Sequence, residues 1–229
     1  MRARERTLGL RLRLALVVLL PALAAMAVAV TGAGRSFDRW LDTQRDTLLR
    51  RPATGQVVVV EIDARSLAHF NRWPWPRSLY GKAVQRLSDA GAQVVAFDVD
   101  FSSASAPAED QAFARAIQAS KATVVLPTFR QESDLGSRHL VENLPIPVLR
   151  EHAFLGSVNV FPDADGVLRS YRSGVSTAGE TRPSLASYLS GVPGQAGRDF
   201  EIEYAIDPHT LPHYSFVDIV EGGPLPAAL

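Results

Sequence analysis

Residues 57–63, with the sequence VVVVEID, are a short β-branched run that ends at an acidic residue. The pattern returns as VVAFD at residues 94–98 and as TVVLP at residues 123–127. Apolar runs of this length, with few polar interruptions, are typical of strands that are covered on both faces. We therefore predict three buried strands, of which the first two end at Asp63 and Asp98.

Two amphipathic segments separate these strands. Residues 78–90 and 110–120 repeat apolar side chains at helical spacing, with Leu87 in the first segment and Ile117 in the second. Strand, helix, strand, helix, strand is the order of a parallel sheet with right-handed crossovers. The fold class is therefore predicted to be α/β, with a largely parallel sheet flanked by helices.

The second half of the chain has a different pattern. Residues 156–161 and 167–175 predict two strands, and the intervening Pro-Asp-Ala-Asp-Gly predicts that they form an antiparallel hairpin. Residues 128–150 are expected to form a polar loop. Three further elements are expected: a helix at 183–189, a strand at 200–204 and a helical turn at 215–220.

The N-terminal segment carries the strongest hydropathy signal. Residues 14–34 contain no charged side chain and are long enough for one transmembrane helix. Five arginines and one acid precede them, so the positive-inside rule places residues 1–13 in the cytoplasm as a short tail. The Ala-Val-Ala at residues 27–29 also fits a cleaved signal peptide, but the apolar run exceeds a typical signal core, which favours an uncleaved anchor.

The remaining chain is predicted to lie outside the cytoplasm, as an amphipathic juxtamembrane helix and linker at residues 35–55 and a domain at residues 56–229. Without the charges of the N-terminal tail, 19 basic and 23 acidic residues remain, a net charge of −4. This balance, with no basic stripe, argues against nucleic-acid binding. The chain has no cysteine, which excludes disulfides and thiolate metal sites.

Acidic residues at strand ends are the first candidates for a binding site. Open α/β sheets bind ligands beyond the carboxyl ends of their strands, where Asp63, Asp98 and Asp100 are expected. Two structural alternatives stay open. Asp63 also fits a helix cap, and Asp98 also fits an ion pair with Arg77.

A second group of candidates is the sequence WPWPR at residues 73–77. Proline restricts the backbone of Trp73 and Trp75 and delivers Arg77 at a probable helix start. Two indoles beside a guanidinium suit an anionic or ring-bearing ligand. Core packing of the two tryptophans is the alternative.

These motifs together resemble a known family. Residues 62–66, the WPWPR element, residues 95–101 and the segment GSVN at 156–159, followed by DADGVLR at 163–169, are similar to landmarks of the CHASE2 extracellular sensor family. The resemblance covers about residues 37–222. It adds Asn159 and Arg169 as weaker site candidates.

The resemblance implies an exported sensor held in the inner membrane of a bacterial cell, which binds an unknown small ligand and forms a homodimer. In the family a further strand, several membrane helices and a cytoplasmic output module follow, so we expect this chain to be the N-terminal part of a longer receptor. A module that binds no small ligand, and instead dimerises the receptor or docks an envelope protein, is the alternative.

Metal and enzyme sites are not expected. Placing Gly166 at the sixth position of a calcium loop puts Phe161 and Arg172 at ligand positions, which excludes that motif. Residues 98–102, DVDFS, partly match the first motif of haloacid-dehalogenase-like phosphatases, but the downstream lysine and acidic pair of those enzymes are missing. The chain is therefore predicted to have no catalytic residue, metal or cofactor.

Overall fold

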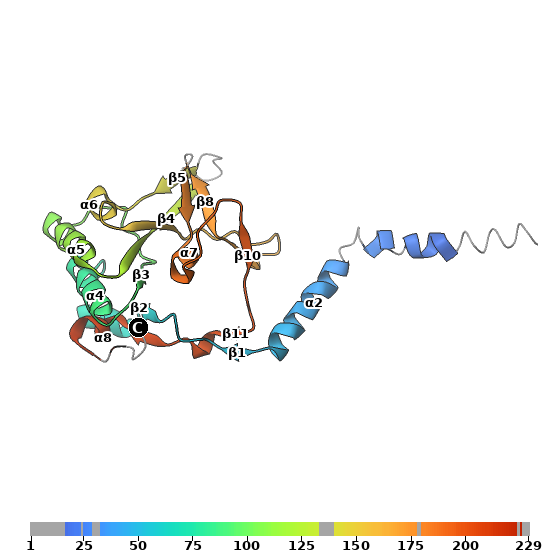
Figure 1. Cartoon of the computed structure of the whole chain (residues 1–229), viewed down its shortest axis with the longest axis horizontal. Coiled ribbons are helices and arrows are strands. Elements are labelled where there is room, and N and C mark those ends of the chain that lie inside the picture. The colour runs from blue at the N-terminus through green and yellow to red at the C-terminus, as the bar shows by residue number, and fades with distance from the viewer. Residues whose placement is uncertain are drawn as a thin grey trace, which may run out of the picture. The chain divides into compact units, whose positions relative to one another are not determined.

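The computed structural model describes residues 17–23, 25–28, 33–132, 140–177, 180–223 and 225. These residues form two compact units: the N-terminal part through Arg51 together with Glu203–Ile206, and the remaining chain, which contains the sheet (Figure 1).

The N-terminal segment is described only in part. Residues 17–23 and 25–28 are helical, whereas 1–16, 24 and 29–32 lie outside the described residues. Among the described helices, none is both long and apolar enough to cross a membrane. The amphipathic helix predicted within residues 35–55 is present as α2 (Ala33–Leu48), in which Phe37 and Trp40 stack with ring centroids 5.9 Å apart.

Two of the three predicted buried strands, β3 (Val94–Ala96) and β4 (Thr123–Glu132), pair in parallel in one sheet, as predicted. Strand β4 lies between β3 and β6 (Phe154–Ser157) and is parallel to both. Helices α4 (Arg77–Asp89) and α5 (Pro107–Ala119) precede β3 and β4. In Figure 1 they lie on one side of β3, and α7 (Leu185–Ser190) lies on the other.

The first predicted strand has a different partner from the one expected. Strand β2 (Val59–Glu61) pairs with β12 (His213–Ser215), in parallel, and not with β3. The expectation of a polar loop at residues 128–150 is also wrong. Strand β4 continues into this region as far as Glu132 and pairs antiparallel with β5 (Leu140–Asn143), which is followed by α6 (Pro147–Arg150); residues 133–139 of the predicted loop lie outside the described residues.

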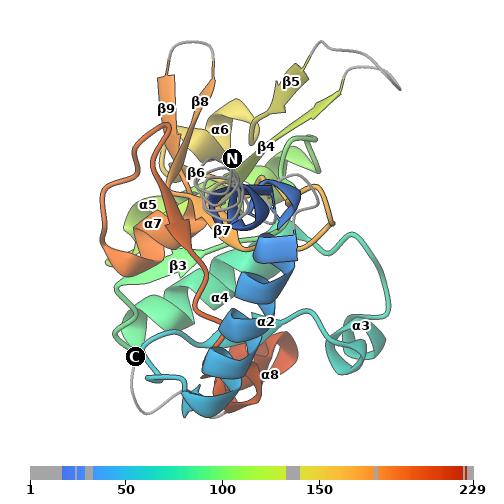
Figure 2. The same ribbon diagram turned by 90° about the vertical axis from the view of Figure 1, so that its right-hand side faces the viewer.

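The predicted hairpin is wrong in its position. Strand β6 pairs with β4 and is therefore not available to the chain after the 162–166 turn. That chain forms β7 (Ser170–Arg172), which pairs antiparallel with β10 (Asp199–Glu201). The antiparallel hairpin lies farther along and consists of β8 (Gly174–Thr177) and β9 (Glu180–Pro183), visible in Figure 2.

Short elements complete the chain. The predicted C-terminal turn is α8 (Phe216–Glu221), and β1 (Arg51–Pro52) pairs with β11 (Ile206–Asp207). The 3-10 helix η1 (Pro208–Thr210) leads toward β12. Helix α3 (Ala64–Phe70) begins directly after β2, because the Asp63 carboxylate accepts a hydrogen bond from the Ser66 amide and so caps it.

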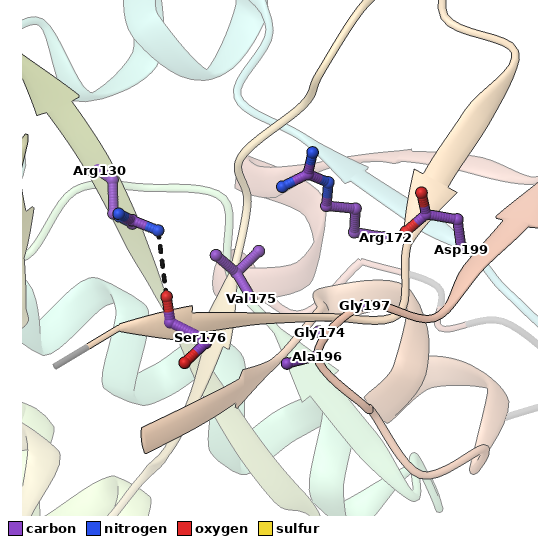
Figure 3. Close-up of a pocket in the computed structure, with 8 residues that line it drawn as sticks. All are labelled: Arg130, Arg172, Gly174, Val175, Ser176, Ala196, Gly197 and Asp199. Carbon is purple, nitrogen blue, oxygen red and sulfur yellow. Dashed lines mark hydrogen bonds between the residues drawn. The ribbon is translucent and has the colours of Figure 1, made fainter. Parts of the chain in front are cut away.

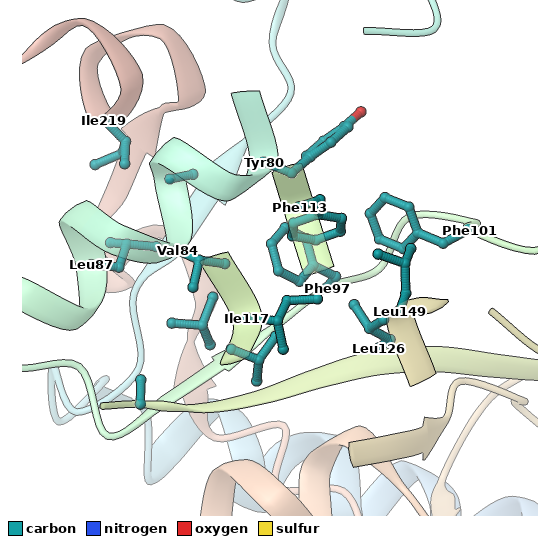
Figure 4. Packing of buried hydrophobic residues seen from close by; sticks show 14 of the residues in the cluster. Tyr80, Val84, Leu87, Phe97, Phe101, Phe113, Ile117, Leu126, Leu149 and Ile219 are labelled. Atoms are coloured by element: carbon teal, nitrogen blue, oxygen red, sulfur yellow. The ribbon is translucent and has the colours of Figure 1, made fainter. Parts of the chain in front are cut away.

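The hydrophobic core lies between the sheet and helices α4, α5 and α8. Its centre is an aromatic cluster in which Tyr80, Phe97, Phe101 and Phe113 meet at ring-centroid distances of 5.2–6.1 Å (Figure 4). Helices α4 and α5 approach closely because Gly81 has no side chain; a Cβ there would lie 3.1 Å from Ala116 Cβ. The carboxyl ends of β3, β4 and β6 are thereby held at one edge of a rigid sheet.

Candidate functional site

The two tryptophans of the WPWPR element have different environments. Trp75 is 3% exposed and stacks on Phe216 at 4.8 Å, whereas Trp73 is 54% exposed and touches Trp75 edge-on. The buried indole connects the loop to α8. The structure therefore gives Trp75 a packing role and leaves only Trp73 available at the surface.

Arg77 is buried and paired, but not with Asp98. Its Nη1 donates to Asp110 Oδ1 at 2.8 Å, and its Nη2 donates to the Ser103 carbonyl. Asp110 also accepts hydrogen bonds from the Ser105 amide at 3.1 Å and the Ser105 hydroxyl at 2.9 Å. The proposed Arg77–Asp98 pair is thus wrong, because α5 supplies the carboxylate from its first turn.

Two of the strand-end acids are engaged locally. Asp63 accepts hydrogen bonds from Ser66 and from the Ser215 hydroxyl, and these bonds lower its pKa, those of Ser66 most. Asp100 accepts from the amide and hydroxyl of Ser102 at 2.8 and 3.0 Å. Asp63 fixes the start of α3, and Asp100 shapes its own turn.

Asp98 is the strand-end acid that stays open. It is exposed, and within the part of the chain that the structure describes its carboxylate has no hydrogen bond or ion pair. The pKa of Tyr171 in β7 is raised, first by burial and second by the Asp98 charge.

The side chain of Asn159, which follows β6, bonds to the backbone of β4 near its carboxyl end. Asn159 Oδ1 accepts from the Arg130 amide at 2.9 Å, and Asn159 Nδ2 donates to the Arg130 carbonyl at 3.0 Å. The amide thus continues the contact with β4 two residues past the end of β6 at Ser157. Among the candidate site residues from the sequence, Asn159 is the one that holds the backbone of Arg130 in place.

A cavity of about 380 Å³ opens beside Arg130. It is lined by residues of β4, β7, β8 and the chain before β10, namely Arg130, Arg172, Gly174, Val175, Ser176, Ala196, Gly197 and Asp199. Figure 3 shows the two guanidinium groups on either side of Val175. The cavity therefore has two cations and one carboxylate at its wall.

The two arginines are held in different ways. Arg130 Nη1 donates to the Ser176 carbonyl at 3.1 Å, while the Arg172 guanidinium lies 3.8 Å from the Phe161 ring centroid. Neither has a carboxylate partner among the described residues. A guanidinium has five N–H donors, and the described residues accept one hydrogen bond from Arg130 and none from Arg172, so most of these donors are available to an anion in this part of the chain.

Comparison of the sequence with protein-family models gives one match. The sequence matches the CHASE2 domain over residues 15–228. The chain belongs to the CHASE2 family. The resemblance of the WPWPR and neighbouring motifs is thereby confirmed, and with it the assignment to a family of extracellular sensor domains. No curated protein and no solved structure matches the chain.

Within this CHASE2 domain, Arg169 lies just before β7 and does not line the cavity. It bonds to Asp163 at 2.7 Å and to Asp165 at 2.9 Å, and these carboxylates raise its pKa. The pair of acids that resembles a calcium loop is thus neutralised by an arginine. Among the described residues no cluster of potential metal ligands occurs.

Sequence reasoning missed Arg130 and Arg172. Arg130 stands in the region expected to be a polar loop, and Arg172 in a predicted hairpin strand that pairs differently. The sequence did contain one signal. The run TVVLPTFR, residues 123–130, continues the strand pattern beyond Pro127 and places an arginine near its carboxyl end.

Proposed function

We propose that this CHASE2 domain is the sensor of a membrane-bound bacterial receptor and binds a small anionic ligand in the cavity between Arg130 and Arg172. The N-terminal apolar segment anchors the chain in the inner membrane, with the domain on the outer side, and a cytoplasmic output module of the same receptor receives the signal. The receptor acts as a homodimer. The family membership supports the sensor role, and the cavity supports the ligand class.

The observation that carries the ligand class is the pair of guanidinium groups at one cavity, neither of which forms an ion pair with a described residue. They come from β4 and β7, which are distant in sequence and not paired with each other. Both have free donors that face one cavity of a size suited to a small molecule. Planar, bidentate donors match carboxylate and phosphate groups. Asp199 at the wall favours a ligand that also has a hydroxyl or amino group.

Three of the predicted site residues do not line the cavity and would act on the ligand through other residues. Asn159 positions the backbone of Arg130, and Arg169 fixes the loop that contains Phe161 under Arg172. The pKa of Tyr171, the neighbour of Arg172 in β7, is raised first by burial and second by the Asp98 charge. A ligand that draws Arg172 inward therefore moves β7 relative to the end of β3, which is a route for a change within the domain.

A thermal-shift titration tests the ligand class. We expect succinate, inorganic phosphate or a sugar phosphate to raise Tm, by an amount that corresponds to about 2.7 kcal/mol at one hundred times the dissociation constant. Arg130→Gln and Arg172→Gln each abolish the shift. Arg115→Gln, on the exposed face of α5, is the matched control and keeps it. No shift with any anion would contradict the ligand class.

A reporter fusion tests the topology. Alkaline phosphatase is active only outside the cytoplasm, so a fusion after Gly55 is expected to be active. A stable but inactive fusion would contradict the proposed orientation.

Crosslinking separates the sensor from the assembly module. The chain has no cysteine, so a single Trp40→Cys on the exposed face of α2 reports only on contacts between two copies. We expect disulfide formation in membranes, with a rate that changes when the anion binds. Crosslinking that never responds to an anion would favour the assembly module.

A further inference from the structure

Asp199 is an acidic residue at the wall of the cavity that Arg130 and Arg172 also line. It is the first residue of β10 and lies opposite Arg172 in the antiparallel pair with β7. Asp199 is exposed, and within the part of the chain that the structure describes its carboxylate has no hydrogen bond or ion pair. Both carboxylate oxygens are therefore available to a donor on a ligand.

Arg172 does not neutralise this carboxylate, although the two residues are partners in the strand register. Its guanidinium lies 3.8 Å from the centroid of the Phe161 ring. In Figure 3 the guanidinium nitrogen atoms of Arg172 lie on the side of Arg130, away from the Asp199 carboxylate. The cavity therefore presents its positive and negative groups separately, and each can bind a group of opposite charge on the ligand.

The charged groups at the wall define the charge of a matching ligand. Two guanidinium groups and one carboxylate give the wall a net charge of +1. A ligand that matches them group by group has two anionic groups and one cationic group. A dianion without the cationic group would leave Asp199 beside an anion with no counter-ion, and like charges in contact lower affinity.

An ammonium group suits Asp199 better than a hydroxyl group does. A hydrogen bond between an ionised donor and a carboxylate is roughly twice as strong as one between neutral groups. A ligand hydroxyl would leave the charge of Asp199 uncompensated where the ligand displaces water, which lowers affinity. The ligand is therefore expected to combine one ammonium group with two acidic groups.

The strand register indicates which group binds to which residue. Arg172 and Asp199 are register partners, so they suit two neighbouring groups of opposite charge, as at the α-carbon of an amino acid. Arg130 belongs to β4 and lies on the other side of Val175 in Figure 3, so it suits a second acidic group farther along the ligand. The cavity, of about 380 Å³, has a size suited to such a small molecule.

We propose that the ligand of this cavity is an acidic α-amino acid, of the class to which aspartate and glutamate belong. Asp199 holds its ammonium group, Arg172 holds its α-carboxylate and Arg130 holds its second acidic group. The inference rests on the proposed anion site and narrows the ligand class of that site.

Calorimetric titration of the whole chain with three matched ligands tests this inference. L-Glutamate has all three charged groups, glutarate lacks the ammonium group, and L-glutamine lacks the second acidic group. We expect the parent to bind L-glutamate at least about tenfold more tightly than either of the others, because each of these loses a charge-assisted hydrogen bond. Asp199→Asn abolishes the preference for L-glutamate over glutarate. Asp89→Asn, at an exposed acidic residue of α4, is the matched control and keeps it.

Three results would overturn this inference and leave the anion site in place. The first is equal affinity of the parent for L-glutamate and glutarate, and the second is equal affinity for L-glutamate and L-glutamine. The third is a preference for L-glutamate over glutarate that survives in Asp199→Asn. Absence of binding by all three ligands and by inorganic phosphate would instead contradict the anion site itself, and this inference with it.

Discussion

Two regions of this domain contain arginine side chains in different environments. One region stabilises the fold, and the other is the proposed binding site. Arg77 lies in a dense contact between α4 and α5, where a carboxylate and a carbonyl accept its hydrogen bonds. Arg130 of β4 and Arg172 of β7 line one cavity together with Asp199, and neither guanidinium forms an ion pair with a described residue. The first region holds the fold together. In the second region, N–H donors of two guanidinium groups have no acceptor among the described residues and are available to a ligand.

The comparison predicts its largest effect at Asp110. Asp110→Ala leaves the Arg77 guanidinium buried without its counter-ion and removes the acceptor of the Ser105 bonds. We expect a loss of about 3–5 kcal/mol, or roughly 10 °C in Tm, in chemical and thermal unfolding. The double variant Arg77→Met, Asp110→Leu regains most of the loss, because neither charge is then buried alone. A single variant as stable as the parent would show that the pair is dispensable.

A loss of similar size is expected at Trp75. Trp75→Ala removes a buried indole and costs about 3–5 kcal/mol, while Trp73→Ala, at a half-exposed position, costs less than about 1 kcal/mol. Trp75→Phe costs less than Trp75→Ala, since the indole Nε1 has no acceptor in the described part of the chain. Equal losses at both tryptophans would remove the distinction between packing and surface in this loop.

The buried region also limits the stability of the domain at alkaline pH. Burial raises the pKa of Tyr80 to about 12, against the opposing charge of Arg77. The unfolded chain releases this proton at about pH 10, so the contribution to stability is complete below that pH and is lost between about pH 10 and 12. Tyr80→Phe therefore reduces the fall in unfolding free energy over this range by about 2 kcal/mol. An unchanged profile would contradict the raised pKa.

The smallest stability effect is expected at acidic pH. Hydrogen bonds with Ser66 lower the pKa of Asp63, and hydrogen bonds with Ser78 lower that of Glu109. A lowered folded pKa gives stability that is present above about pH 4 and disappears as the pH falls through the folded value. Asp63→Asn keeps a capping side chain without the charge, so it flattens the acid limb of a denaturation series and leaves stability at pH 7 nearly unchanged. An unaltered acid limb would exclude this contribution.

The same contrast explains what the sequence could predict. The β-branched runs and the spacing of Leu87 and Ile117 depend on local periodicity, and β3, β4, α4 and α5 were found where they were expected. Pairing is not local. Residues 156–157 pair with β4 because that edge is buried, and this removes them from the hairpin that the turn sequence indicated.

The site was less predictable than the fold, for a related reason. The WPWPR element is the most specific motif in the sequence, yet its specificity reflects the packing of Trp75 and Arg77. The rule that ligands bind at the carboxyl ends of strands selected Asp63, Asp98 and Asp100, none of which lines the cavity beside Arg130. It could not name Arg172, because the pairing of β7 with β10 brings that residue to the cavity.

The central claim is that the cavity between Arg130 and Arg172 binds an anion, and calorimetric titration of the whole chain tests it most directly. Succinate and inorganic phosphate are titrated separately into the parent, into the double variant Arg130→Gln, Arg172→Gln and into the control Arg115→Gln. We predict saturable heat for at least one anion in the parent and the control, and none in the double variant. Equal binding by all three chains, or by none, would contradict the account.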